Sequence, residues 1–207
     1  MLRASFVFTV FFMLLGPIKV IPAFFKLTQG ATPAFKREVA IKAALLASAV
    51  VAVVALLGTG MVEAYAISLD GLRLAGGVVL LMSALKIMFP AAEPPSTDSS
   101  TPTALQLAMS PVAVPLIVPP AGIAAILIFV GLAPKSPGME VVIPMALAAM
   151  MALDFLVMFF IDQIVSVPGL LLLLQVFGAI LMFIQVALAA ETLMIAFRSL
   201  GVLGGTT

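Results

Sequence analysis

Two charged side chains lie inside stretches of sequence that are otherwise apolar. Lys19 falls in the apolar run 4–27, and Asp154 falls near the middle of the run 139–161. A charged side chain at the centre of a bilayer costs about 2.5–3.5 kcal/mol on insertion scales, so such residues pair, face water or mark a functional site. For Lys19 the alternatives are a ligand or counter-ion role and a side chain that snorkels or sits in a wet re-entrant segment. For Asp154 they are a cation or proton site and a structural ion pair, with Lys19 as the candidate partner.

Proline interrupts the apolar sequence twice, at 16–22 and at 111–122. Proline has no N–H to give to a helix interior, and its ring clashes with the carbonyl four residues earlier. Inside lipid, backbone that has lost its partners persists only where protein or a water-filled cavity covers it. We therefore expect helix breaks that form a solute site, or inert kinks. The predicted substrate-binding residues are Gly16, Pro17, Lys19, Pro22, Pro115, Pro119, Pro120, Gly122 and Asp154.

The depth of the first break follows from helix geometry. Residues 4–15 would form a helix of about 18 Å at 1.5 Å per residue. This is too short to cross a hydrocarbon core of about 30 Å. The first break is therefore predicted near the middle of the bilayer, and residues 105–118 place the second at a similar depth.

Other polar residues in the apolar sequence have simpler explanations. Asp70 and Arg73 are spaced to form a surface ion pair at the start of a helix. Gln175 and Gln185 are expected to make interhelical hydrogen bonds, as such groups usually do in membranes.

Composition indicates a polytopic membrane protein. The 207 residues are 64% hydrophobic and 9% charged, with a mean hydropathy of +1.33, whereas a soluble domain is about 45–50% apolar and about 25% charged. The net charge of +1 argues against a nucleic-acid partner. The chain has no Cys and no His, which excludes thiol catalysis, disulfides and the usual zinc and haem ligands. No catalytic constellation is found, so we expect no enzyme, no cofactor and no metal.

The elements that must position these residues are six predicted transmembrane helices, because about 20 apolar residues are needed for each span. The N-terminal apolar run is too long for a signal peptide and is interpreted as the first span. The spans are predicted at residues 4–27, 39–61, 72–89, 103–133, 139–161 and 170–198.

The sequence divides into two similar halves. The first half, 1–89, is followed by a Pro-, Ser- and acid-rich linker at 90–102, which is predicted to be flexible. The second half is 103–200, and 201–207 is a tail. A shift of 102 residues places Gly76 on Gly178 and Pro17 on Pro119. Because three spans per half is an odd number, the second half must enter the membrane from the opposite side, as in many secondary transporters.

Basic residues predict the orientation. The first connection, 28–42, holds Lys36 and Arg37, with Lys26 and Lys42 at its edges. Cytoplasmic loops carry an excess of Lys and Arg. We therefore expect this connection in the cytoplasm and both termini outside.

The interrupted stretches resemble the MarC family of bacterial inner-membrane proteins. The family's first-span motif, N-P-x-G-x-x-P-x-F, is kept at Pro17, Ile18, Pro22 and Phe24. Gly16 and Lys19 replace its Asn and Gly, which changes the chemistry of the first break. The fourth-span motif, P-x-A-x-P-L-x-x-G-P-G-A-I, is kept at Pro111, Ala113, Pro115, Leu116, Pro120 and Ile123.

The glycines of the third span complete the resemblance. Gly76 and Gly77 match the family's A-G-G-x-x-L-L, and with Gly178 they are expected to allow close helix packing. The MarC family is distantly related to LysE-type amino-acid exporters, and this analogy of fold implies transport. The resemblance does not imply drug efflux.

The function predicted from these observations is secondary transport or export of a small polar solute across the bacterial inner membrane. Lys19 and Asp154 would supply the polar groups, and proton or cation coupling through Asp154 is allowed. The partners are then the lipid bilayer, an unidentified solute and, as an open alternative, further copies of the chain. The competing hypothesis is a membrane scaffold or partner-binding protein that transports nothing.

Overall fold

The computed structural model describes residues 3–89 and 102–202, and every regular element in those ranges is helical. The predicted all-α class is therefore confirmed. In chain order the elements are α1 (Ala4–Leu15), α2 (Pro17–Leu27), α3 (Pro33–Ala64), α4 (Leu69–Met88), α5 (Ala104–Leu107), η1 (Ala108–Ile117), α6 (Pro120–Leu132), η2 (Ala133–Lys135), α7 (Met139–Phe159), α8 (Ile161–Val165) and α9 (Leu170–Ser199).

The described helices include four segments long and apolar enough to cross a membrane. They are the α1–α2 stretch, the 33–62 part of α3, α7 and α9. A fifth is added if the pair 104–117 and 120–132, bent by 56°, counts as one span. The sixth predicted span corresponds to α4, which carries Asp70, Arg73 and Lys86 in its 20 residues and falls outside this set. Six spans therefore stay a prediction.

The turn between α1 and α2 follows from local chemistry. Gly16 has extended backbone angles, φ −79° and ψ 171°, because the residue before a proline is disfavoured in the helical region. Pro17 then opens α2 at its first position, where a missing N–H costs nothing. Pro22 lies inside α2, so the two prolines of this stretch have different effects.

The second interrupted stretch is less regular. Ser110 and Val114 inside η1 have extended angles, φ −145° and −134°. Each precedes a proline, and both Xaa–Pro bonds are cis. Pro119 and Pro120 then start α6.

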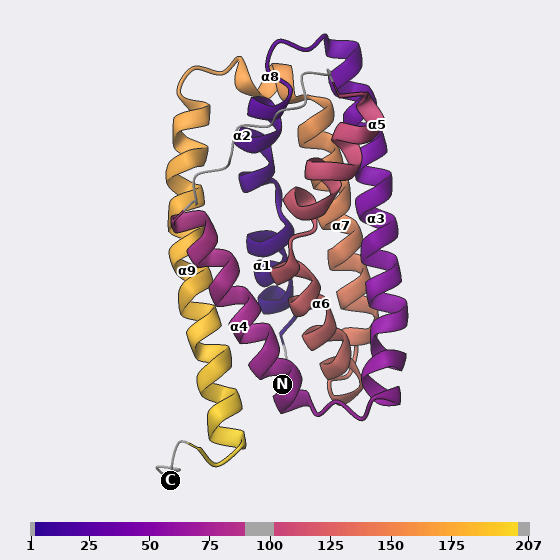
Figure 1. Ribbon diagram of the computed structural model, residues 1–207, viewed down its shortest axis with the longest axis vertical. Helices are drawn as coiled ribbons and strands as arrows, with labels where there is room; N and C mark the ends of the chain where they lie inside the picture. The colour runs from indigo at the N-terminus through magenta and orange to yellow at the C-terminus, as the bar shows by residue number, and fades with distance from the viewer. Residues whose placement is uncertain (1–2, 90–101, 203–207) are drawn as a thin grey trace.

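The core lies where α1 and α2 meet α6 and α7. Large buried side chains at this centre include Phe11, Leu15, Ile126, Met150 and Met158. Figure 1 shows α3 and α9 on opposite sides of the bundle, with α1 and α2 between them. The long helices pair as α3 with α7 and α4 with α9.

Several predicted boundaries differ from the structure. α3 begins at Pro33 instead of residue 39, so Lys36 and Arg37 belong to its first turns and not to a loop. α8 occupies much of the predicted connection 162–169. The predicted linker, apart from residue 102, and residues 203–207 of the tail lie outside the described residues.

Candidate functional site

Asp154 is the most unusual polar residue of the bundle. It lies on α7, is fully buried, and neither carboxyl oxygen has a hydrogen-bond partner in the described chain. Its helix face also carries Met150 and Met158, which are both fully buried. A buried polar atom without a partner costs about 1–3 kcal/mol, and more if it is charged. Asp154 is therefore suited to hold a proton or a cation, since either would neutralise its charge.

Lys19 lies in the first turn of α2, just past the break. Its ammonium group donates a hydrogen bond to the carbonyl oxygen of Leu14. Leu14 is in the last turn of α1, where helix carbonyls have no partner within the helix. Cations are favoured at this end of a helix. Lys19 therefore compensates the helix end that Gly16 and Pro17 create.

Lys19 and Asp154 do not form the direct ion pair that the sequence offered as one alternative. Lys19 is bonded to Leu14, and Asp154 accepts no hydrogen bond from any described residue. Their helices, α2 and α7, are nonetheless in contact. The structure thus brings both predicted residues to one region without joining them.

The two interrupted stretches touch each other. A Cβ atom added to Gly122 would lie 2.4 Å from Cδ2 of Leu15, so α6 packs tightly against the end of α1. A Cβ on Gly16 would instead clash with the carbonyl oxygen of Phe12 in the last turn of α1. Glycine at 122 therefore permits the close approach of the two stretches, and glycine at 16 permits the end of α1.

The predicted prolines are distributed differently around this contact. Pro17 is buried and Pro22 and Pro119 are partly buried, whereas Pro115 and Pro120 are exposed on the outside of the bundle. The stretch 111–122 thus contributes Gly122 to the centre, while two of its prolines face outwards.

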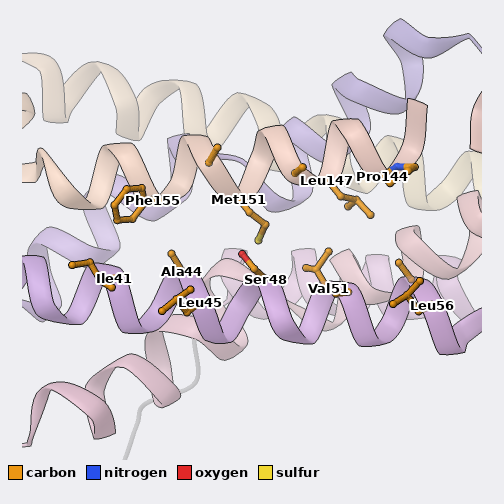
Figure 2. Close-up of a pocket in the computed structure, with 14 residues that line it drawn as sticks. Ile41, Ala44, Leu45, Ser48, Val51, Leu56, Pro144, Leu147, Met151 and Phe155 are labelled. Carbon is orange, nitrogen blue, oxygen red and sulfur yellow. The ribbon is translucent and has the colours of Figure 1, made fainter. Parts of the chain in front are cut away.

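Two cavities lie elsewhere, along the seam between α3 and α7. The first has a volume of about 630 Å³ and the second about 280 Å³. Figure 2 shows the first, with side chains of both helices on its two sides. Neither cavity is lined by Lys19, Asp154 or any glycine or proline of the two interrupted stretches.

The remaining predicted polar contacts have mixed outcomes. Arg73 donates to Asp70 at 2.9 Å, and Gln185 donates to the carbonyl of Leu80 at 3.3 Å, so both predictions are confirmed. Gln175 is exposed on α9, and no hydrogen bond joins it to another helix in the described chain.

The predictions for the glycines also have mixed outcomes. Added Cβ atoms on Gly76 and Gly77 would both lie 2.7 Å from neighbouring side chains, those of Ile128 and Leu193. A Cβ on Gly178 would meet nothing within 4 Å. Close packing is therefore confirmed in α4, and the expectation for Gly178 is wrong because that face of α9 is open.

Sequence reasoning missed a polar cluster that joins α3 to the end of α7 and to α8. Lys36, whose side chain is only 10% exposed, pairs with Asp162 at 2.6 Å. The Arg37 guanidinium lies 5.1 Å from the centre of the Phe159 ring. The basic residues of the sequence predict only the orientation, because no sequence signal links residues 36 and 37 to residues more than 120 positions away.

Apolar helices, a fully buried carboxyl and charged groups gathered at helix ends define a polytopic integral membrane protein. Comparison with family models makes this more specific. Residues 3–197 match the MarC family of integral membrane proteins. The chain belongs to this family, as its motifs suggested.

Two curated archaeal proteins are similar to the chain. A UPF0056 membrane protein of Pyrococcus horikoshii is 25% identical over 134 residues, covering 65% of this chain and 66% of the relative. A UPF0056 membrane protein of Methanocaldococcus jannaschii is 29% identical over 124 residues, covering 58% of this chain and 60% of the relative. The chain thus spans slightly less than two thirds of each relative's length. No solved structure matches it.

Proposed function

We propose that the chain is a secondary transporter or exporter of a small polar solute in the bacterial inner membrane, built from two inverted three-helix repeats. The observation that carries this proposal is Asp154, which is fully buried without a hydrogen-bond partner in the described chain. A protein with only a structural task gains nothing from such a carboxyl. Ionisable residues inside a membrane commonly mark the ion pathways and proton relays of pumps and transporters.

The pattern of helix contacts supports the inverted repeat. In the two halves, α1 would correspond to η1, α2 to α6, α3 to α7 and α4 to α9. Under this correspondence the contact of α1 with α7 matches the contact of η1 with α3. The contact of α2 with α9 likewise matches the contact of α6 with α4, and all four contacts occur. In Figure 1, α2 lies above α1 whereas α6 lies below α5, so the two interrupted segments run in opposite directions.

Through Lys19, the charge of Asp154 would control the angle between α1 and α2 at their junction. While Asp154 holds a proton or cation, the Lys19 ammonium stays on the Leu14 carbonyl. When Asp154 releases it, the bare carboxylate attracts Lys19 away from the end of α1. The last turn of α1 then loses its cation, and the α1–α2 junction at Gly16 is free to change its angle.

Uptake into proteoliposomes tests this proposal. A panel of radiolabelled amino acids serves as probe solutes, driven by an imposed pH or sodium gradient. We expect uptake of at least one probe by the wild type, and loss of gradient-driven uptake in Asp154→Asn and Lys19→Ala. Asp162→Asn is the matched control, because Asp162 is half exposed and is paired with Lys36. Uptake that is unchanged in Asp154→Asn would contradict the coupling role.

The second candidate function is a membrane scaffold or partner-binding protein. Tight packing of Leu15 on Gly122 at the contact between the breaks favours it, as does the position of the two cavities between α3 and α7. Absence of uptake for every probe by folded wild-type protein would support this candidate over transport.

A further inference from the structure

The first cavity lies between α3 and α7, and the second continues it towards α6 and η2, so that together they form one groove, called here the α3/α7 groove. They share four lining residues, Ala55, Leu56, Pro144 and Leu147. The α3/α7 groove lies at the surface of the bundle, since Leu45 and Leu56 on its sides are 67% and 77% exposed. In the membrane it therefore opens towards lipid.

The lining of the groove suits a hydrocarbon chain. Ser48 is the one polar residue among those lining the first cavity, and small side chains leave the seam hollow: Ala44, Ala52, Ala55, Ala148 and Ala152. From Ile41 to Leu56 the groove follows α3 for about 22 Å at 1.5 Å per residue, which is more than half of a hydrocarbon core of about 30 Å. A polar solute would find almost no hydrogen-bond partner along this length.

The groove ends at a cation. Arg37 precedes Ile41 by one helical turn and so lies on the same face of α3. Phe159 follows Phe155, another lining residue, by one turn of α7. The Arg37 guanidinium lies over the Phe159 ring at 5.1 Å, and these two side chains close this end of the seam.

Arg37 is the cation of this cluster that has no carboxylate partner in the described part of the chain. Lys36 pairs with Asp162 at 2.6 Å and Lys42 with Glu38 at 2.5 Å. Stacking on a ring leaves the guanidinium N–H groups free to bind a phosphate, for which their planar geometry is suited. The exposed position of Arg37 gives a headgroup access.

We propose that the α3/α7 groove binds an anionic phospholipid, with the phosphate on Arg37 and one acyl chain along the seam. A cavity of about 630 Å³ is within the range of small-molecule sites, about 300–1,000 Å³. An entire helix is about 10 Å wide and would need a broader trough. Basic pockets between helices on the cytoplasmic side are suited to anionic lipid headgroups, and this end of α3 is predicted to be cytoplasmic.

Fluorescence quenching by brominated lipids tests the proposal, and the absence of native Trp makes a single introduced one a clean reporter. Leu45→Trp places the reporter on the groove, in vesicles with brominated phosphatidylglycerol or the same fraction of brominated phosphatidylcholine. We expect about a fivefold binding preference for the anionic lipid, as one basic group near the surface provides. Arg37→Gln should remove that preference, and Ala148→Phe should reduce quenching by both lipids.

Phe183→Trp is the matched control, because Phe183 is 72% exposed on α9 and lies outside the groove. It should be quenched equally by both lipids. Helical circular dichroism of each variant establishes that it is folded. Equal quenching of Leu45→Trp by both lipids would overturn the proposal. A second result would also overturn it: neither lipid quenches Leu45→Trp, and Leu45→Cys forms disulfide crosslinks between copies of the chain. A second chain would then fill the groove.

Discussion

Asp154 is a single residue whose burial is expected to lower the stability of the folded protein. Its carboxyl is buried without a hydrogen-bond partner in the described chain, so an apolar side chain of similar size should be more stable there. We expect Asp154→Leu to raise the free energy of unfolding by about 1–3 kcal/mol, the cost of a buried unsatisfied polar group. The measurement is SDS-induced unfolding in mixed micelles.

The same substitution at a paired site provides the comparison. Asp162→Leu removes the carboxylate partner of Lys36, which is buried although Asp162 is half exposed. We expect this substitution to lower stability, because the buried lysine is left without its partner. If Asp154→Leu is the less stable of the two variants, Asp154 makes a structural interaction and the coupling role loses its main support.

At the residue scale, the sequence identified the unusual groups but not their partners. Lys19 and Asp154 stand out because charges are rare in apolar runs. That Lys19 bonds to Leu14 depends on the direction α2 takes after Gly16. This direction is set by packing around the break, which residue types alone do not determine.

Helix ends were the least predictable feature at the scale of elements. Hydropathy marks where a helix meets lipid and not where it ends, so α3 extends beyond its apolar part to Pro33. Prolines differ for a similar reason. Pro17 starts a new helix, whereas Pro144 lies inside α7, and only the surrounding contacts distinguish the two cases.

Gly16, at the junction of α1 and α2, and Gly178, inside α9, should respond to alanine in opposite directions. Gly16→Ala places a Cβ where the Phe12 carbonyl lies 2.0 Å away, so we expect a loss of about 1–3 kcal/mol from overpacking. Gly178→Ala meets nothing within 4 Å and should gain about 0.5–1 kcal/mol from helix propensity. SDS unfolding of both variants measures this, and a loss at Gly178 would show that α9 has a close partner on that face.

For the whole molecule, the membrane class and the MarC family could be predicted from the sequence, because composition and motifs are properties of the chain itself. The inverted repeat stays a prediction. Apolar segments resemble one another at many shifts, and Gly76 and Gly178, which the shift aligned, have different surroundings. The exchange of helix contacts between the halves is stronger support, since it does not depend on residue identity.

The absence of native Cys allows a direct test of orientation. Gln29 lies between α2 and α3, and Ser68 between α3 and α4; both are exposed. With both termini outside, Ser68→Cys should react with a membrane-impermeant maleimide on intact spheroplasts. Gln29→Cys should react only after permeabilisation. The reverse pattern would invert the proposed topology and place Arg37 in the outer leaflet.

The pairing of α4 with α9 has a consequence for biogenesis. α4 buries Gly77 against Leu193 and receives a hydrogen bond at Leu80 from Gln185, and it carries charged residues near both ends, Asp70, Arg73 and Lys86. Its partner leaves the ribosome about 100 residues later. α9, with 6% of its apolar window buried, can enter lipid unaided. Co-translational insertion would therefore hold α4 in a provisional position until α9, the last described helix, arrives to complete the bundle.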